Sequence, residues 1–253
     1  MSIILESHRG LASNYPENTM VAMRAAVSLG YGMIELDTKF TLDNRCVILH
    51  DRTLNRTARR TDGSTLPENS LCTDSTYDEL RTLDFGLWFD KKFAGEPIPT
   101  LEDVLALTKE SGVPLKFDNV MWSHTPQQRA MMFDTIEKMN VLPNVGFTCG
   151  NLNCIRELLV RFPSAYVHYD GIPDTENLAA LSQLLPRERL TVWLRYHNEH
   201  TSWCQTPPVS AELAATVAPV ATIGLWLLTK SEELADAEKL NVQFVETDGS
   251  LRP

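Results

Sequence analysis

Histidine and arginine side chains stand at the ends of two short apolar runs near the start of this 253-residue chain. His8 and Arg9 follow Ile3-Ile4-Leu5, and His50 follows residues 46–49. A lone histidine at a strand end is usually structural, but two that converge can act as an acid/base pair because histidine titrates near neutral pH. The fork of donors on Arg9 suits a phosphate, the alternative being an ion pair with Glu17. These residues indicate acid/base chemistry on a phosphate-containing substrate.

Carboxylates recur at neighbouring positions of the chain. Glu35 and Asp37 are two residues apart in an apolar stretch, so on a strand both point to one face. Two buried carboxylates repel, and a divalent cation removes that cost. Asp118 would supply a third oxygen ligand, and an all-oxygen site suits Mg²⁺ or Ca²⁺ rather than zinc. The alternative is an ion pair of Glu35 and Asp37 with a buried lysine or arginine.

The elements that must position these residues alternate between short apolar runs and helical patterns. Apolar runs predict eight strands, at 3–7, 33–40, 114–118, 145–149, 165–169, 190–196, 222–228 and 242–247. Helices are expected after Thr19, after Thr100 up to Gly112, and at 126–140, 152–161, 175–184, 210–217 and 231–239. This pattern predicts a (β/α)₈ barrel, whose active site lies at the carboxyl ends of the strands.

One apolar run does not fit the barrel count. Residues 46–49 follow the second strand after a few polar residues, too few for a parallel crossover. We therefore expect a hairpin that turns at Asp43-Asn44 and extends strand two. Residues 51–98 then form an insertion before strand three, within a single domain spanning residues 1–253.

Composition limits the classes of partner. Lys and Arg number 23 and Asp and Glu 33, a formal net charge of −10, which argues against nucleic acid and against stable association with an anionic membrane. No apolar run approaches a membrane span, and five cysteines without a CxxC pair are typical of reduced thiols. We expect a cytoplasmic protein, and the sequence is compatible with a homo-oligomer.

Five motifs occur in order within the first 60 residues: HRG at 8–10, PENT at 16–19, ExD at 35–37, HD at 50–51 and LNRT at 54–57. In order and spacing they resemble the glycerophosphodiester phosphodiesterase family. Weaker similarities at 95–103, Trp226 and Thr247-Asp248 extend the resemblance over essentially the whole chain. It implies a phosphatidylinositol-phospholipase-C-like barrel, one divalent metal held by Glu35, Asp37 and a third acid, and His8 with His50 as the acid/base pair. It also implies that Glu17 supports Arg9 or the metal site, and that the chemistry belongs to lipid metabolism.

The third strand departs from the family pattern. The typical Glu-x-Lys reads Asp118-x-Val120 here, while Lys116 lies two residues earlier on the same face. We expect Lys116 to pair with Glu35, Asp37 or Asp118 and to approach the substrate phosphate. Trp226 is expected to contact substrate, and the loop at 197–209 is either a lid or an ordinary surface loop.

The sequence therefore predicts a metal-dependent phosphodiesterase that hydrolyses a small soluble glycerophosphodiester to an alcohol and glycerol 3-phosphate. The alternatives are a hydrolase or a cyclising lyase that acts on a different, sugar-containing phosphodiester, or a catalytically inactive binding barrel. Either water or an adjacent substrate hydroxyl could be the nucleophile.

Overall fold

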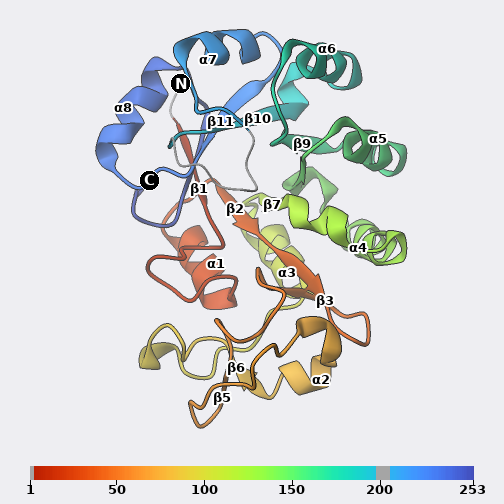
Figure 1. Cartoon of the computed structure of the whole chain (residues 1–253), viewed down its shortest axis with the longest axis vertical. Helices are drawn as coiled ribbons and strands as arrows, with labels where there is room; N and C mark the ends of the chain where they lie inside the picture. The colour runs from red at the N-terminus through yellow and green to blue at the C-terminus, as the bar shows by residue number, and fades with distance from the viewer. Residues whose placement is uncertain (1–2, 198–205) are drawn as a thin grey trace.

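The computed structural model describes residues 3–197 and 206–253. Within these ranges, eight parallel strands close into a barrel in the order β1-β12-β11-β10-β9-β8-β7-β2 (Figure 1). The barrel strands are β1 (Ile4–Ser7), β2 (Met33–Leu36), β7 (Leu115–Phe117), β8 (Val145–Cys149), β9 (Tyr166–Tyr169), β10 (Leu190–Arg195), β11 (Thr222–Trp226) and β12 (Phe244–Thr247). The predicted (β/α)₈ barrel is confirmed.

Helices cover the outside of the barrel between successive strands. They are α1 (Met20–Ser28), α3 (Leu101–Ser111), α4 (Pro126–Met139), α5 (Leu152–Arg161), α6 (Thr175–Leu184), α7 (Ala211–Val217) and α8 (Ser231–Lys239). Local signals set their ends: the Thr19 hydroxyl accepts a hydrogen bond from the Ala22 N–H, and Thr100 forms a capping box with Asp103. Gly112 ends α3 in the left-handed region at φ 73°, which glycine adopts without steric cost.

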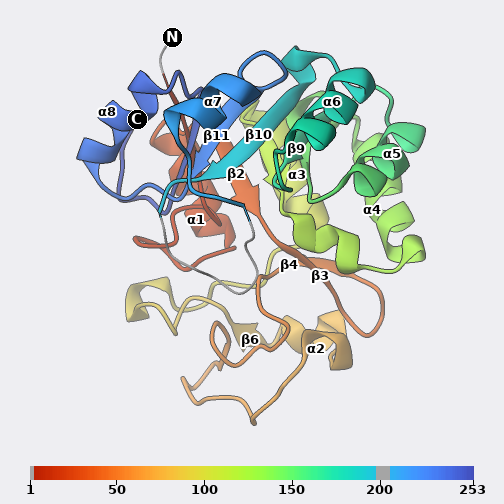
Figure 2. The ribbon, with the colours of Figure 1, turned by 45° about the horizontal axis from the view of Figure 1, so that its top comes forward.

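The predicted second strand is divided in the structure. β2 ends at Leu36, and after Asp37 the chain leaves the barrel as β3 (Thr38–Phe40), which pairs antiparallel with β4 (Cys46–Ile48). Figure 2 shows this hairpin reaching away from the barrel. The hairpin is therefore confirmed, but residues 33–40 are not one continuous strand, because Leu49 donates its N–H to the Asp37 carbonyl and so holds the chain where it departs.

Residues 51–98 lie beside the hairpin and away from most of the barrel (Figure 1). They contain β5 (Arg59–Arg60), α2 (Tyr77–Leu80) and β6 (Leu83–Asp84). A second apolar cluster joins this segment to the hairpin; its buried members are Val47, Leu49, Leu54, Ala58, Cys72, Leu80, Phe85 and Ile98. The insertion thus packs against the arm that carries His50.

No helix in residues 3–197 or 206–253 is long and apolar enough to cross a membrane. The predicted lid concerns a loop that falls mostly outside the described residues. Its described end, Val209, donates its N–H to the Arg195 carbonyl over 2.7 Å.

Candidate active site

The candidate metal ligands converge at the carboxyl end of the barrel strands. Glu35 lies on β2, and Asp37 and Asp118 directly follow β2 and β7. One ligand atom from each of the three lies within 4.8 Å of the others, and within the described residues this is the one group that could hold a metal. Burial and the charges of Asp37, Glu246 and Asp118 raise the pKa of Glu35. Oxygen donors so close together fit a hard divalent cation.

The HRG stretch wraps around this carboxylate cluster. Arg9 and Gly10 both have positive φ, and a Cβ on Gly10 would press into Ala22 of α1 at 2.7 Å. The turn directs the Arg9 backbone N–H to the Glu35 carboxylate over 2.9 Å, while the guanidinium lies 3.4 Å from Asp37. For Asp37, both possibilities raised by the sequence are therefore present. It forms an ion pair with Arg9, and it also belongs to the cluster of three carboxylates.

The PENT stretch folds back onto the HRG turn. Asn18, in the left-handed region, donates its backbone N–H to the Arg9 carbonyl and its side-chain amide to Asp37, each over 2.9 Å. Glu17 accepts a hydrogen bond from the Arg9 guanidinium over 3.1 Å. The two motifs thus form one unit that holds Arg9 and Asp37 in place.

The His8 ring faces two carboxylates. Its Nε2 lies 4.0 Å from Glu35 and 3.8 Å from Glu246, and the side chain is about a quarter exposed. Burial lowers the pKa of His8, although the Glu246 charge opposes that shift. The ring is thus positioned between Glu35 of the carboxylate cluster and Glu246 of the barrel interior, with access to solvent.

His50 approaches from the hairpin arm rather than from the barrel. It comes directly after Leu49, whose N–H is bound to the Asp37 carbonyl, so its backbone starts beside that of Asp37. Its Nδ1 lies 2.6 Å from Asp51, which leaves Nε2 as the nitrogen available to a substrate. The pKa of Asp51 is lowered to about 2, mainly by its hydrogen bonds from Arg56, although burial acts in the opposite direction. No hydrogen bond or ion pair within the described residues joins His50 directly to the three carboxylates.

Lys116 points into the barrel, but its ion pairs differ from those expected. Its ammonium lies 2.5 Å from Glu6 and 2.7 Å from Glu246, and its side chain is 5% exposed. The ammonium also lies 3.7 Å from the Trp193 ring centroid. The partners named from the sequence (Glu35, Asp37 and Asp118) were wrong, and substrate binding by Lys116 stays a prediction.

Glu6 and Glu246 are site residues that the sequence reasoning missed. They are register partners on β1 and β12. Burial raises the pKa of Glu6; burial would do the same for Glu246, but the charges of Lys116 and His8 outweigh it and hold its pKa at about 2. A signal was present, because Glu6 lies two residues before His8 and so shares its face of the strand.

The remaining predicted residue, Trp226, ends β11, so it lies at the same end of the barrel as the other site residues. Its carbonyl accepts a hydrogen bond from the Tyr196 N–H. Its contact with substrate stays a prediction.

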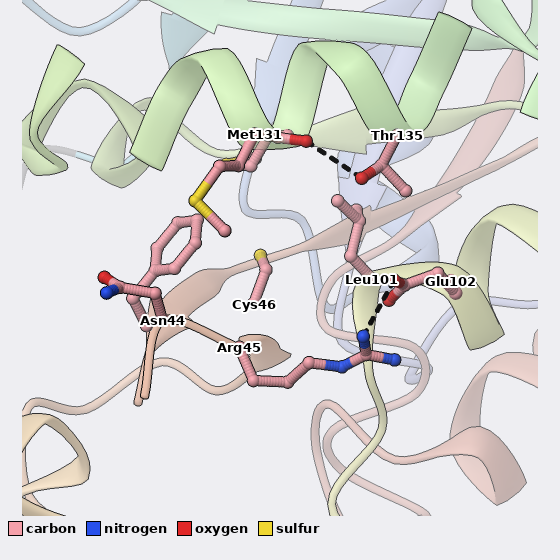
Figure 3. A pocket seen from close by; sticks show the side chains of 9 residues that line it. Asn44, Arg45, Cys46, Leu101, Glu102, Met131 and Thr135 are labelled. Carbon is pink, nitrogen blue, oxygen red and sulfur yellow. Dashed lines mark hydrogen bonds and ion pairs between the residues drawn. The ribbon is translucent and has the colours of Figure 1, made fainter. Parts of the chain in front are cut away.

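A pocket elsewhere on the molecule contains none of the predicted site residues. It lies between the β3-β4 hairpin and helices α3 and α4, and its lining includes Cys46 and Met131 (Figure 3). An ion pair of 3.1 Å between Arg45 and Glu102 borders it. The chemistry is therefore expected at the mouth of the barrel and not in this pocket.

A profile of a known protein family matches more than half of this chain. The profile of the Glycerophosphoryl diester phosphodiesterase family matches residues 8–147, a range that contains all three carboxylates and both histidines. The chain belongs to this family. A glycerophosphodiester phosphodiesterase of Bacillus altitudinis is 39% identical over 172 residues, which are 66% of this chain and 66% of the relative. One from Caldanaerobacter subterraneus subsp. tengcongensis is 42% identical over 107 residues, 42% of this chain and 41% of the relative.

Solved structures of this family share the fold. A glycerophosphoryl diester phosphodiesterase from Silicibacter pomeroyi has a TM-score of 0.76 at 19% identity and covers 97% of this chain and 90% of its own. An Oleispira antarctica phosphodiesterase, solved in complex with the product sn-glycerol-3-phosphate, has a TM-score of 0.75 at 18% identity, covering 98% and 93%. At these identities the likeness establishes the barrel.

Proposed function

We propose that this chain is a metal-dependent phosphodiesterase that hydrolyses a small glycerophosphodiester to an alcohol and glycerol 3-phosphate. The observation that carries the proposal is the convergence of Glu35, Asp37 and Asp118 within 4.8 Å, with His8 4.0 Å from Glu35. The family assignment and the product named for the Oleispira antarctica relative support the substrate class.

The donor set fits a divalent metal. Glu35, Asp37 and Asp118 would hold Mg²⁺ or Ca²⁺ through carboxylate oxygens, and the mutual repulsion that adds to burial in raising the pKa of Glu35 would then be relieved. When bound, such an ion would polarise the phosphoryl group and stabilise the negative charge that develops there. Arg9 would bind phosphate oxygens through the N–H groups that Glu17 and Asp37 do not use.

The two histidines would move the protons. As the nucleophilic oxygen attacks phosphorus and the bond to the leaving alcohol breaks, one histidine accepts the proton of the nucleophile and the other donates a proton to the leaving oxygen. Asp51 fixes the orientation of the His50 ring through Nδ1, so that Nε2 faces the reaction. Lys116 would act on the substrate only at a distance through its charge, because Glu6 and Glu246 occupy its ammonium.

Phosphorus NMR on a panel of diesters tests this proposal. The panel includes glycerophosphocholine, glycerophosphoethanolamine and a sugar phosphodiester, each incubated with Mg²⁺ or Ca²⁺ in ¹⁸O-labelled water. The expected result is a glycerol 3-phosphate signal that carries one ¹⁸O and that forms far more slowly with a His8→Ala preparation. A lasting cyclic phosphate would indicate a lyase, and no conversion of any diester would contradict the proposal.

A further inference from the structure

Arg56 lies between two carboxylates that belong to different motifs. Its Nε and Nη2 donate to Asp51 over 2.8 and 3.0 Å, and its Nη1 and Nη2 donate to Glu17 over 2.7 and 2.8 Å. Its Cζ also lies 5.8 Å from the ring centroid of Trp88, in the insertion. Bidentate pairing on two edges fixes a guanidinium in a way that a lysine ammonium could not reproduce.

The Asp51 partner of Arg56 is also the partner of His50. Asp51 accepts from His50 Nδ1 through Oδ1, and both of its oxygens are bound by Arg56. The carboxylate therefore cannot turn without breaking a bond to Arg56. His50 itself is about two-fifths exposed and emerges from a hairpin arm, and the hydrogen bond to Asp51 restrains its ring.

On the opposite edge, Glu17 connects Arg56 to the barrel. Glu17 is shared between Arg56 and Arg9, and Arg9 lies 3.4 Å from Asp37. Arg56 thus provides a side-chain link between the segment that follows His50 and the turn that contacts the carboxylate cluster, in addition to the backbone bond from Leu49 to Asp37. The PENT stretch with Glu17 and the LNRT stretch with Arg56, whose two residues are 39 positions apart, thus meet through this one side chain.

We propose that Arg56 is a positioning residue that holds His50 in register with the carboxylate cluster by fixing Asp51 against Glu17. This inference rests on the proposed function, because it assigns His50 to the reaction. Arg56 acts through Asp51 and touches no reacting atom. Two rival roles remain: Arg56 could only stabilise the insertion, or it could act on Arg9 through Glu17.

A double-mutant cycle separates these roles. We expect Arg56→Met to lower kcat by on the order of 10- to 100-fold with little change in KM, since misplacing a reacting group costs about this much. In a His50→Ala background the same substitution should cost less than about 2-fold, because the group it positions is already gone. Independent, multiplicative effects of the two substitutions would overturn the proposal in favour of the Arg9 route.

Arg161 provides the matched control. It also joins two carboxylates, Asp134 and Glu137, and its side chain is 39% exposed, against 42% for Arg56. Arg161→Met should leave kcat and KM unchanged. Arg56→Lys keeps the charge but cannot hold both carboxylates bidentately, so kcat should lie between those of wild type and Arg56→Met; it also serves if Arg56→Met fails to fold.

A measurement independent of turnover keeps this inference separate from the proposed function. In ¹H–¹⁵N spectra of the imidazole groups, the Nδ1 proton of His50 should be visible in wild type and lost or shifted in Arg56→Met. An unchanged His50 resonance in a folded Arg56→Met protein would refute the positioning role, even if wild type hydrolysed none of the diesters. Inactivity of wild type together with the expected change in the spectrum would reject the reaction and leave the geometry standing.

Discussion

The group of Glu6, Lys116 and Glu246 predicts a large and pH-dependent loss of stability for Lys116→Met. Lys116 lies 2.5 and 2.7 Å from the two carboxylates, and all three side chains are at most a tenth exposed. Glu6, with its pKa raised, holds a proton most readily, whereas the pKa of Glu246 is held at about 2. Removing the ammonium leaves the Glu246 charge buried without its main partner, and breaking a buried pair in this way usually costs ~3–5 kcal/mol.

In Lys116→Met the buried Glu246 carboxylate can take up a proton, and the free energy that this protonation costs determines how much stability the variant loses. Neutralising a carboxyl of ordinary pKa ~4.3 costs ~1.4 kcal/mol per pH unit, hence about 4 kcal/mol at pH 7 and about 1 kcal/mol at pH 5. In wild type the folded pKa of Glu246 is depressed, so its ionised form adds stability that is lost only as pH falls towards about 2. In Lys116→Met the folded pKa rises above the unfolded value, so the deficit of the variant grows as pH rises above ~4.3.

Urea unfolding of wild type and variant between pH 5 and 8, followed by circular dichroism in the presence of a chelator, measures this deficit. Adding Glu246→Gln to Lys116→Met should recover most of the loss at pH 7, because no buried charge then remains to be neutralised. Lys239→Met removes a lysine whose ion pair with Asp236 is solvent-exposed, and its midpoint should not change. A deficit below ~1 kcal/mol at pH 7, or one independent of pH, would refute the reasoning.

Three further predictions concern the metal, the histidines and the packing of the barrel. Exhaustive chelation should abolish turnover, and added Mg²⁺ or Ca²⁺ should restore it. In a thermal melt, an ion at 100 times its Kd should stabilise the fold by ~2.7 kcal/mol. Activity that survives chelation would contradict the metal site. His8→Ala and His50→Ala should each lower kcat by on the order of 10²–10⁴-fold without lowering Tm, and a near wild-type kcat would remove that histidine from the mechanism. Gly146→Ala should lower Tm by the equivalent of ~1–3 kcal/mol, because its Cβ would overlap the buried His168 ring, which Trp193 holds through a hydrogen bond. Gly150→Ala is the control, because the nearest atom to its added Cβ lies 3.4 Å away. Equal melting temperatures of the two variants would contradict the packing argument.

The barrel could be predicted from the sequence because its signals are local. Capping at Thr19 and Thr100, the stop at Gly112 and the apolar runs between them mark the elements without knowledge of their neighbours. The division of the second strand at Asp37 was missed, since the residues on both sides are equally buried and the bond from Leu49 that fixes the departure is not local. Strand alternation, a local rule, brought Glu35 and Asp37 together with the acid that follows β7.

The interior partners of Lys116 show where this reasoning stopped. A buried lysine requires a counter-charge, but the sequence reasoning considered only the acids already assigned to the metal. Glu6 and Glu246 each directly follow apolar residues within a predicted strand, where a buried charge is costly unless it is paired. Their pairing with Lys116 of β7 crosses the barrel interior, and the order of elements along the chain does not show which interior side chains meet.

Two layers of charge in the barrel differ in how they are balanced, and the difference bears on the metal. In the lower layer, Lys116 contacts both Glu6 and Glu246, so the protein supplies its own counter-charge. In the upper layer the pairing is weaker: Glu17 and Asp37 share Arg9, and Glu35 meets the His8 ring at 4.0 Å. Asp118 forms no ion pair among the described residues, and the charges of Lys39 and Lys116 act on it only from farther away. Because the same barrel pairs its inner carboxylates directly with lysine, the weaker pairing at the mouth is consistent with the divalent ion that we propose for Glu35, Asp37 and Asp118.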